Sequence, residues 1–111
     1  MGILTDVKKY LGISEDDNYF DSQIIMCINS AFATLTQIGA GPKEGFTISD
    51  DSREWSEFES DFASSWIQMN VSANVKRMFD PPTNGSVMEA LNDVISETEW
   101  RAYIDADGKT V

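Results

Sequence analysis

Apolar residues recur every three or four positions through residues 20–38, and no other feature constrains the fold of this chain as strongly. They are Phe20, Ile24, Ile28, Ala31, Leu35 and Ile38. Ile25 and Phe32 widen this stripe on one side. The spacing predicts a helix with one face buried in a core. Gly39 suits the C′ position, and Gly41-Pro42 prevents the helix from continuing.

Another long helix, the third main helix along the chain, is predicted from about Phe62 to Phe79. Apolar side chains occupy so much of its circumference that few polar positions remain, which is typical of a central helix. They are Phe62, Trp66, Ile67, Met69, Val71, Ala73, Val75, Met78 and Phe79. Asp80-Pro81-Pro82 ends the helix, because proline has no backbone N–H and disfavours helix in the preceding residue.

Two further helices are predicted toward the ends of the chain. Thr5 can cap a short first helix, which Gly12 can end. Ser86-x-x-Glu89 has the form of a capping box and predicts the start of the last helix. Residues 103–111 contain few apolar side chains, so we expect an irregular tail there.

An insertion separates the second and third main helices. It begins with the glycines and proline near residue 41, and Phe46-Thr47-Ile48 can be extended. Residues 50–61 contain six acidic residues and one Arg. Trp55 and Phe58 predict a short helix there with one apolar edge. The whole pattern predicts an all-α fold: a single small domain of four to five helices with this loop insertion.

The charge balance limits the partners. The chain has 111 residues, of which 19 are acidic and 8 basic, for a net charge of −11. This argues against a module that grips nucleic acid, since phosphate binding needs clustered Lys and Arg. An acidic surface suits solubility, a basic partner, or a channel through which DNA slides without sticking. No apolar run approaches the roughly 20 residues of a membrane span.

Residue types needed for common active sites are missing. There is no histidine and no Gly-rich phosphate loop, so we expect no enzyme activity and no cofactor. Asp16-Asp17-Asn18 and residues 105–108 lack the ligand ladder of a calcium loop. Cys27 is the one cysteine, so no intrachain disulfide can form, which fits a reducing cytoplasm. Without a base near it in the sequence, Cys27 is interpreted as a buried structural thiol.

Several segments, taken in order, resemble a known protein family. The chain begins ILTDVKKYLGI at residues 3–13, followed by an acidic stretch, and its second helix ends near Gly39. The third long helix runs into Met78-Phe79-Asp80-Pro81-Pro82, and the final helix ends ISETEWR at residues 95–101. This order and spacing resemble the small head–tail connector proteins of long-tailed phages, also called DNA-packaging connectors. The resemblance covers nearly the whole chain.

The resemblance implies a structural role in the virion. Such a subunit, made in the host cytoplasm, would join copies of itself in a closed ring of about twelve beneath the portal protein. The ring would extend the DNA channel and present a surface to the stopper protein. DNA would pass without specific binding, and no membrane would be involved.

Three sets of residues are candidates for these contacts. Trp and Arg are typical interface anchors, and the candidate subunit interface is Trp55, Trp100 and Arg101, with the core as the alternative place for both tryptophans. Carboxylates repel phosphate, and the candidate channel-lining loop is Phe46, Ile48, Asp50, Asp51, Glu54 and Glu57. The candidate portal-binding tail is Tyr103, Ile104 and Val111.

Two other functions remain open from the sequence. A DNA-mimic or inhibitor protein would use dense carboxylates to occupy the basic groove of a DNA-binding protein, and would be a stable monomer or dimer. A small enzyme would need a pocket that contains carboxylates with perturbed pKa values.

Overall fold

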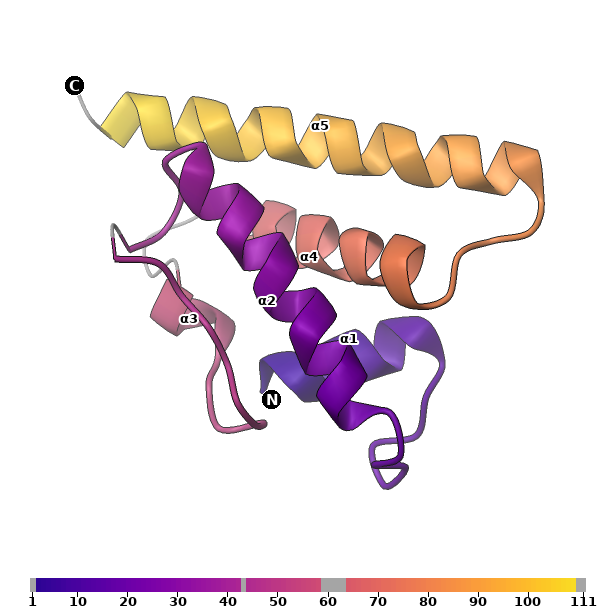
Figure 1. Cartoon of the computed structure of the whole chain (residues 1–111). Helices are drawn as coiled ribbons and strands as arrows, with labels where there is room; N and C mark the ends of the chain where they lie inside the picture. The colour runs from indigo at the N-terminus through magenta and orange to yellow at the C-terminus, as the bar shows by residue number, and fades with distance from the viewer. Residues whose placement is uncertain (1, 43, 59–63, 110–111) are drawn as a thin grey trace.

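The computed structural model of the chain describes residues 2–42, 44–58 and 64–109 (Figure 1). Its helices are α1 (Ile3–Leu11), α2 (Asp21–Gln37), α3 (Trp55–Phe58), α4 (Ser64–Phe79) and α5 (Gly85–Lys109). No strand occurs within those ranges. The predicted all-α domain of four to five helices, with an insertion after the second main helix, is confirmed. Phe62, where we expected the third main helix to begin, lies outside the described residues.

Helix α4 is the central element, as the sequence predicts. It packs against α1, α2, α3 and α5. Helix α5 runs antiparallel to α4 and spans one side of the molecule, whereas α1 lies on the other side of α4 (Figure 1). Helix α2 crosses α4 from the side of α1 to the side of α5, and its C-terminal end reaches α5.

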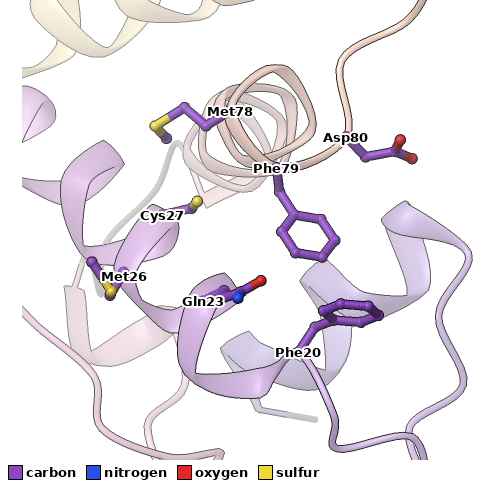
Figure 2. A pocket seen from close by; sticks show the side chains of 7 residues that line it. All are labelled: Phe20, Gln23, Met26, Cys27, Met78, Phe79 and Asp80. Carbon is purple, nitrogen blue, oxygen red and sulfur yellow. The ribbon is translucent and has the colours of Figure 1, made fainter.

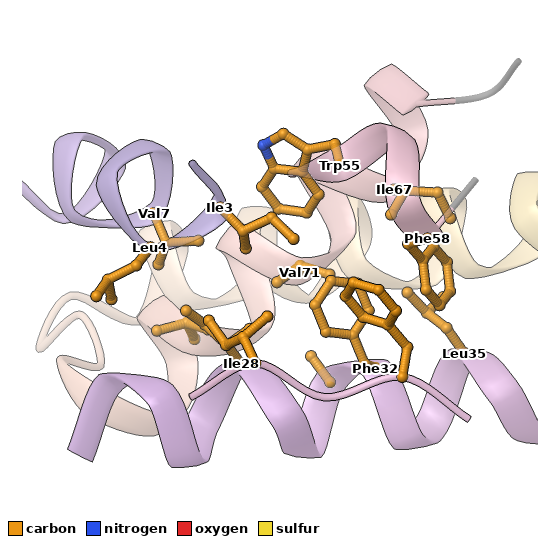
Figure 3. Packing of buried hydrophobic residues seen from close by; sticks show 14 of the residues in the cluster. Ile3, Leu4, Val7, Ile28, Phe32, Leu35, Trp55, Phe58, Ile67 and Val71 are labelled. Carbon is orange, nitrogen blue, oxygen red and sulfur yellow. The ribbon is translucent and has the colours of Figure 1, made fainter. Parts of the chain in front are cut away.

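The core is centred on Phe32, which is fully buried (Figure 3). Its ring centroid lies 4.9 Å from that of Phe46, 4.7 Å from that of Phe58 and 6.1 Å from that of Trp55. These three partners all come from the insertion between α2 and α4. The insertion is therefore part of the core, and the buried stripe of α2 needs it as a cover.

A glycine allows the insertion to pack this closely. Gly41 has φ +74°, and a Cβ at this position would lie 2.4 Å from the Phe58 ring. Any other residue would strain the backbone and displace Phe58 from the core.

The first helix begins earlier than predicted and is capped from a distance. It starts at Ile3, so Thr5 lies inside it and is not its cap. The Asp51 carboxylate accepts a hydrogen bond from the Thr5 backbone N–H at 2.9 Å, and a second from the Thr5 hydroxyl. The Ile3 N–H donates to the Arg53 carbonyl at 3.0 Å. The insertion thereby satisfies backbone donors that the start of a helix leaves without intrahelical partners.

The last helix also differs from the prediction at both ends. Asn84, and not Ser86, provides its cap: the Asn84 side-chain oxygen accepts hydrogen bonds from the N–H groups of Ser86 and Val87, at 2.8 and 3.2 Å. At the other end, α5 continues to Lys109, whereas we expected an irregular tail from residue 103. Ala102 is buried against the core and prolongs the inward-facing stripe, so the helix extends by further turns.

Helices α4 and α5 are joined by a buried polar seam. Asn70 is fully buried, and its amide donates to the Thr98 hydroxyl at 3.0 Å and to the Ile95 carbonyl at 3.2 Å. Farther along, Arg77 donates to the side-chain oxygens of Asn74 and Asn92, at 3.2 and 3.0 Å. The bonds of Asn70 satisfy polar groups that would otherwise be costly to bury, whereas the bond between Arg77 and Asn92 lies at the exposed edge of the helix pair.

Candidate interaction surfaces

Three residues that we expected to form contacts between subunits or along the channel serve the core of their own chain. Trp55 is only 6% exposed, and its indole N–H donates to the Asp6 carboxylate at 2.8 Å. Phe46 is buried between Phe32 and Phe58. Ile48 is buried as well. Little of these side chains remains for a partner. For Trp55 the core was the alternative that the sequence left open, whereas Phe46 and Ile48 lie in the first part of the insertion, which has no helical period to indicate their burial.

Asn29 holds the insertion against α2. Its amide group donates to the Ile48 carbonyl at 3.0 Å, and its side-chain oxygen accepts from the Ile48 N–H at 2.8 Å. One side chain thus satisfies both backbone groups of one loop residue, much as a neighbouring strand would.

The acidic residues of the insertion separate into two kinds. Asp51 caps α1, and Glu57 accepts hydrogen bonds from the Arg53 side chain at 2.7 Å and from the Glu54 N–H at 2.8 Å. Asp50 and Glu54 are exposed. Hydrogen bonds from the Ser52 side chain and backbone N–H lower the pKa of Asp50, which keeps it ionised. Asp50 and Glu54 are therefore the members of the channel-lining set whose charge does not serve the packing of the chain.

The C-terminal half of α5 exposes a cluster of apolar side chains. Trp100 is 58% exposed and its ring lies 6.2 Å from that of Tyr103, with exposed Ile104 on the following turn. We call Trp100, Tyr103 and Ile104 the α5 surface. The structure thus joins residues that we had divided between subunit and portal contacts. Val111 lies outside the described residues.

Arg101 lies next to this surface in sequence but contacts its own chain. Its guanidinium carbon lies 4.9 Å from the centre of the Trp66 ring, and it pairs with Glu97 at 2.8 Å. Arg101 therefore helps to hold α5 against α4.

A second apolar surface, which the sequence did not predict, is a groove between α2 and α4 (Figure 2). It has a volume of about 550 Å³, and its lining residues are Phe20, Gln23, Met26, Cys27, Met78, Phe79 and Asp80. Met26 is 72% exposed, and Met78 is exposed as well. Burial raises the pKa of the Cys27 thiol, as expected of an unreactive group. The one feature of the sequence that could have indicated this groove is Met26, an apolar residue outside the buried stripe of α2.

A metal site requires a group of ligand residues, and a membrane span requires a long apolar helix. In the part of the chain that the structure describes, no three His, Cys, Asp or Glu residues are grouped so as to hold a metal ion. Among the same residues, no helix has the length and apolar character needed to cross a membrane. What the geometry offers is several apolar surfaces on an acidic helical chain, among them the two described above, which suits binding to other proteins.

A comparison with protein-family models decides the assignment. The model described as phage connector protein matches residues 3–109, nearly the whole chain. The chain belongs to the phage connector protein family. This connector is thus a structural component of the virion that interacts with other proteins of the phage head and tail. Searches of curated proteins and of solved structures gave no match.

Proposed function

We propose that this connector assembles into a closed ring of about twelve copies that extends the DNA channel between the portal and stopper proteins. The family match over residues 3–109 carries the proposal. Its support from the structure is that one subunit has more than one apolar surface, including the α5 surface and the groove between α2 and α4. A subunit needs two different contact surfaces to join a neighbour on each side of a ring.

The end of α5 is proposed to reach the portal. Ala102 is buried, Tyr103 and Ile104 are exposed, and the helix continues beyond them to Lys109. The final turns lie at the edge of the molecule (Figure 1). Removing them would therefore leave the core intact, which allows portal docking and folding to be tested separately.

Native mass tests this function. We expect the full chain, alone or mixed with the portal protein of the same phage, to form a species of about a dozen subunits by size-exclusion chromatography with light scattering. It should sediment together with the portal ring. A chain lacking residues 105–111 should fold and assemble but no longer sediment with the portal. A stable monomer or dimer that ignores the portal would contradict the proposal and favour the DNA-mimic alternative.

The acidic insertion is proposed to approach the channel. Changing Asp50→Asn together with Glu54→Gln removes two exposed charges without touching the contacts of Asp51 or Glu57. Since carboxylates in a channel repel phosphate, we expect a several-fold change in the rate of DNA ejection from phage particles, with normal assembly.

A matched pair on α5 provides the control. Glu89→Gln with Asp93→Asn removes the same charge from an exposed part of that helix. If DNA is ejected at the normal rate from particles with the Asp50 and Glu54 variant, or if the control changes the rate equally, the proposal that the insertion approaches the channel is contradicted.

A further inference from the structure

We propose that the α5 surface of one connector subunit occupies the groove between α2 and α4 of the next subunit. The inference rests on the proposed ring and specifies its subunit contact. The occupant of the groove is thus a second copy of this chain, and each subunit uses both surfaces at once.

The chemistry of the two surfaces is complementary. Trp100, Tyr103 and Ile104 are spaced i, i+3 and i+4, which is the pattern by which a helix anchors in an apolar groove. The groove offers Met26 and Met78, whose unbranched, polarisable side chains adapt to aromatic rings. Aromatic anchors on one side and methionine on the other are typical of helix recognition by a preformed groove.

The distribution of charge favours contact at these two places. Copies of a chain with net charge −11 repel one another. After Asp21, however, no residue of α2 is charged. At the edge of the groove, Asp80 pairs with Lys76 at 2.8 Å, and beside the α5 surface Glu97 pairs with Arg101 at 2.8 Å. Glu99, which precedes Trp100, adds one carboxylate beside the α5 surface. Two acidic subunits nevertheless meet fewer carboxylates here than across the acidic insertion.

The two surfaces also lie in different parts of the subunit. The groove includes Met78 and Phe79, at the C-terminal end of α4. Because α5 is antiparallel to α4, the α5 surface lies toward the other end of this helix pair (Figure 1). A contact between unlike surfaces is heterologous, and repetition of such a contact builds a ring when the rotation closes.

The size of the contact predicts its strength. Large side chains bury about 150–250 Å² each when they pass from full exposure to full burial. Trp100, Tyr103 and Ile104 are 58%, 46% and 45% exposed in the free chain, so the three anchors would newly bury about 300 Å² on one subunit. Stable pairs of proteins bury about 800 Å² on each partner. A single contact is thus weak, and we expect assembly to depend on ring closure or on the portal as a template.

Cross-linking between two different chains tests the contact. One chain carries Cys27→Ser and Met26→Cys, and the other carries Cys27→Ser and Tyr103→Cys with a longer tag. Each then has one thiol, so only links between chains are possible. Mixed in equal amounts with portal protein and treated with a short bis-maleimide, they should give predominantly the mixed dimer on a denaturing gel. Each chain treated alone should remain monomeric on the gel.

Two further results would decide against the inference. If rings form but no product joins positions 26 and 103, or if the links are mainly between like positions, the proposed contact is contradicted while the proposed ring stands. The absence of any ring, with or without portal, would overturn both. As a check on folding, Trp100→Ala should retain the unfolding midpoint of the full chain, since the side chain is exposed, while weakening assembly about tenfold or more.

Discussion

Replacing Phe32 with alanine is expected to lower the free energy of unfolding by about 4 kcal/mol, because removing a buried Phe ring costs 3–5 kcal/mol through lost burial and the cavity left behind. Phe32 is fully buried and meets Phe46, Trp55 and Phe58, which belong to one insertion. The ring thus joins α2 to the insertion. Domains of this size are stable by about 5–15 kcal/mol in total, so the variant should lose a large part of its stability.

Phe20→Ala is the matched control. Phe20 is only partly buried and contacts Phe79 at the edge of the core, with ring centroids 5.4 Å apart. The same atoms are removed, but the site opens to solvent and leaves no closed cavity, so we expect about half the loss or less. Urea unfolding followed by circular dichroism measures both. Equal losses for the two variants would show that the insertion is not a necessary cover of α2.

Asp51→Ala is expected to cost about 2–3 kcal/mol, although the residue is exposed. Its carboxylate accepts hydrogen bonds from the backbone N–H and the hydroxyl of Thr5. A lost N-cap costs about 1–2 kcal/mol, and hydrogen bonds to a charged group contribute about 1.5–3 kcal/mol each. The negative charge also lies at the start of α1, where the helix dipole favours it.

Asp50→Ala separates this cap from simple loss of charge. Asp50 has the same side chain one position earlier, but its hydrogen bonds go to nearby Ser52. We expect the unfolding midpoint to change little, as for most surface substitutions. Chemical denaturation at low and high salt would compare the two variants. If both lose the same stability, or if salt abolishes the difference, then general electrostatics and not the cap explains the effect.

The helices could be predicted from sequence because their signal is local. The stripe from Phe20 to Ile38 and the proline stop at Asp80-Pro81-Pro82 identified α2 and the end of α4. The residues that cap the helices were harder to predict. Asn84 and Ser86 are both good cap residues two positions apart, and only the path of the chain decides between them. The cap of α1 comes from Asp51, 46 residues away from Thr5, and no local pattern contains that information.

The interaction surfaces show the same limit. Trp100 was a candidate from its residue type and its charged neighbours, and it is exposed. Trp55 has similar neighbours but is buried, because the fold of the insertion turns it toward Phe32. The groove depends on the approach of Met26 and Met78 from two helices, which a sequence read along one helix at a time does not reveal.

The buried seam between α4 and α5 has a consequence for assembly. Asn70 finds its partners at Thr98 and Ile95, so sliding α5 by one turn, about 5.4 Å, would leave this amide without them in the core. The seam therefore fixes the register of α5 along α4, and with it the distance of Trp100 from the end of α4. In a ring built by the contact proposed above, that length sets the step from one subunit to the next, and with it the curvature. Asn70, which is buried within its own subunit, would then help to determine the number of subunits in the ring.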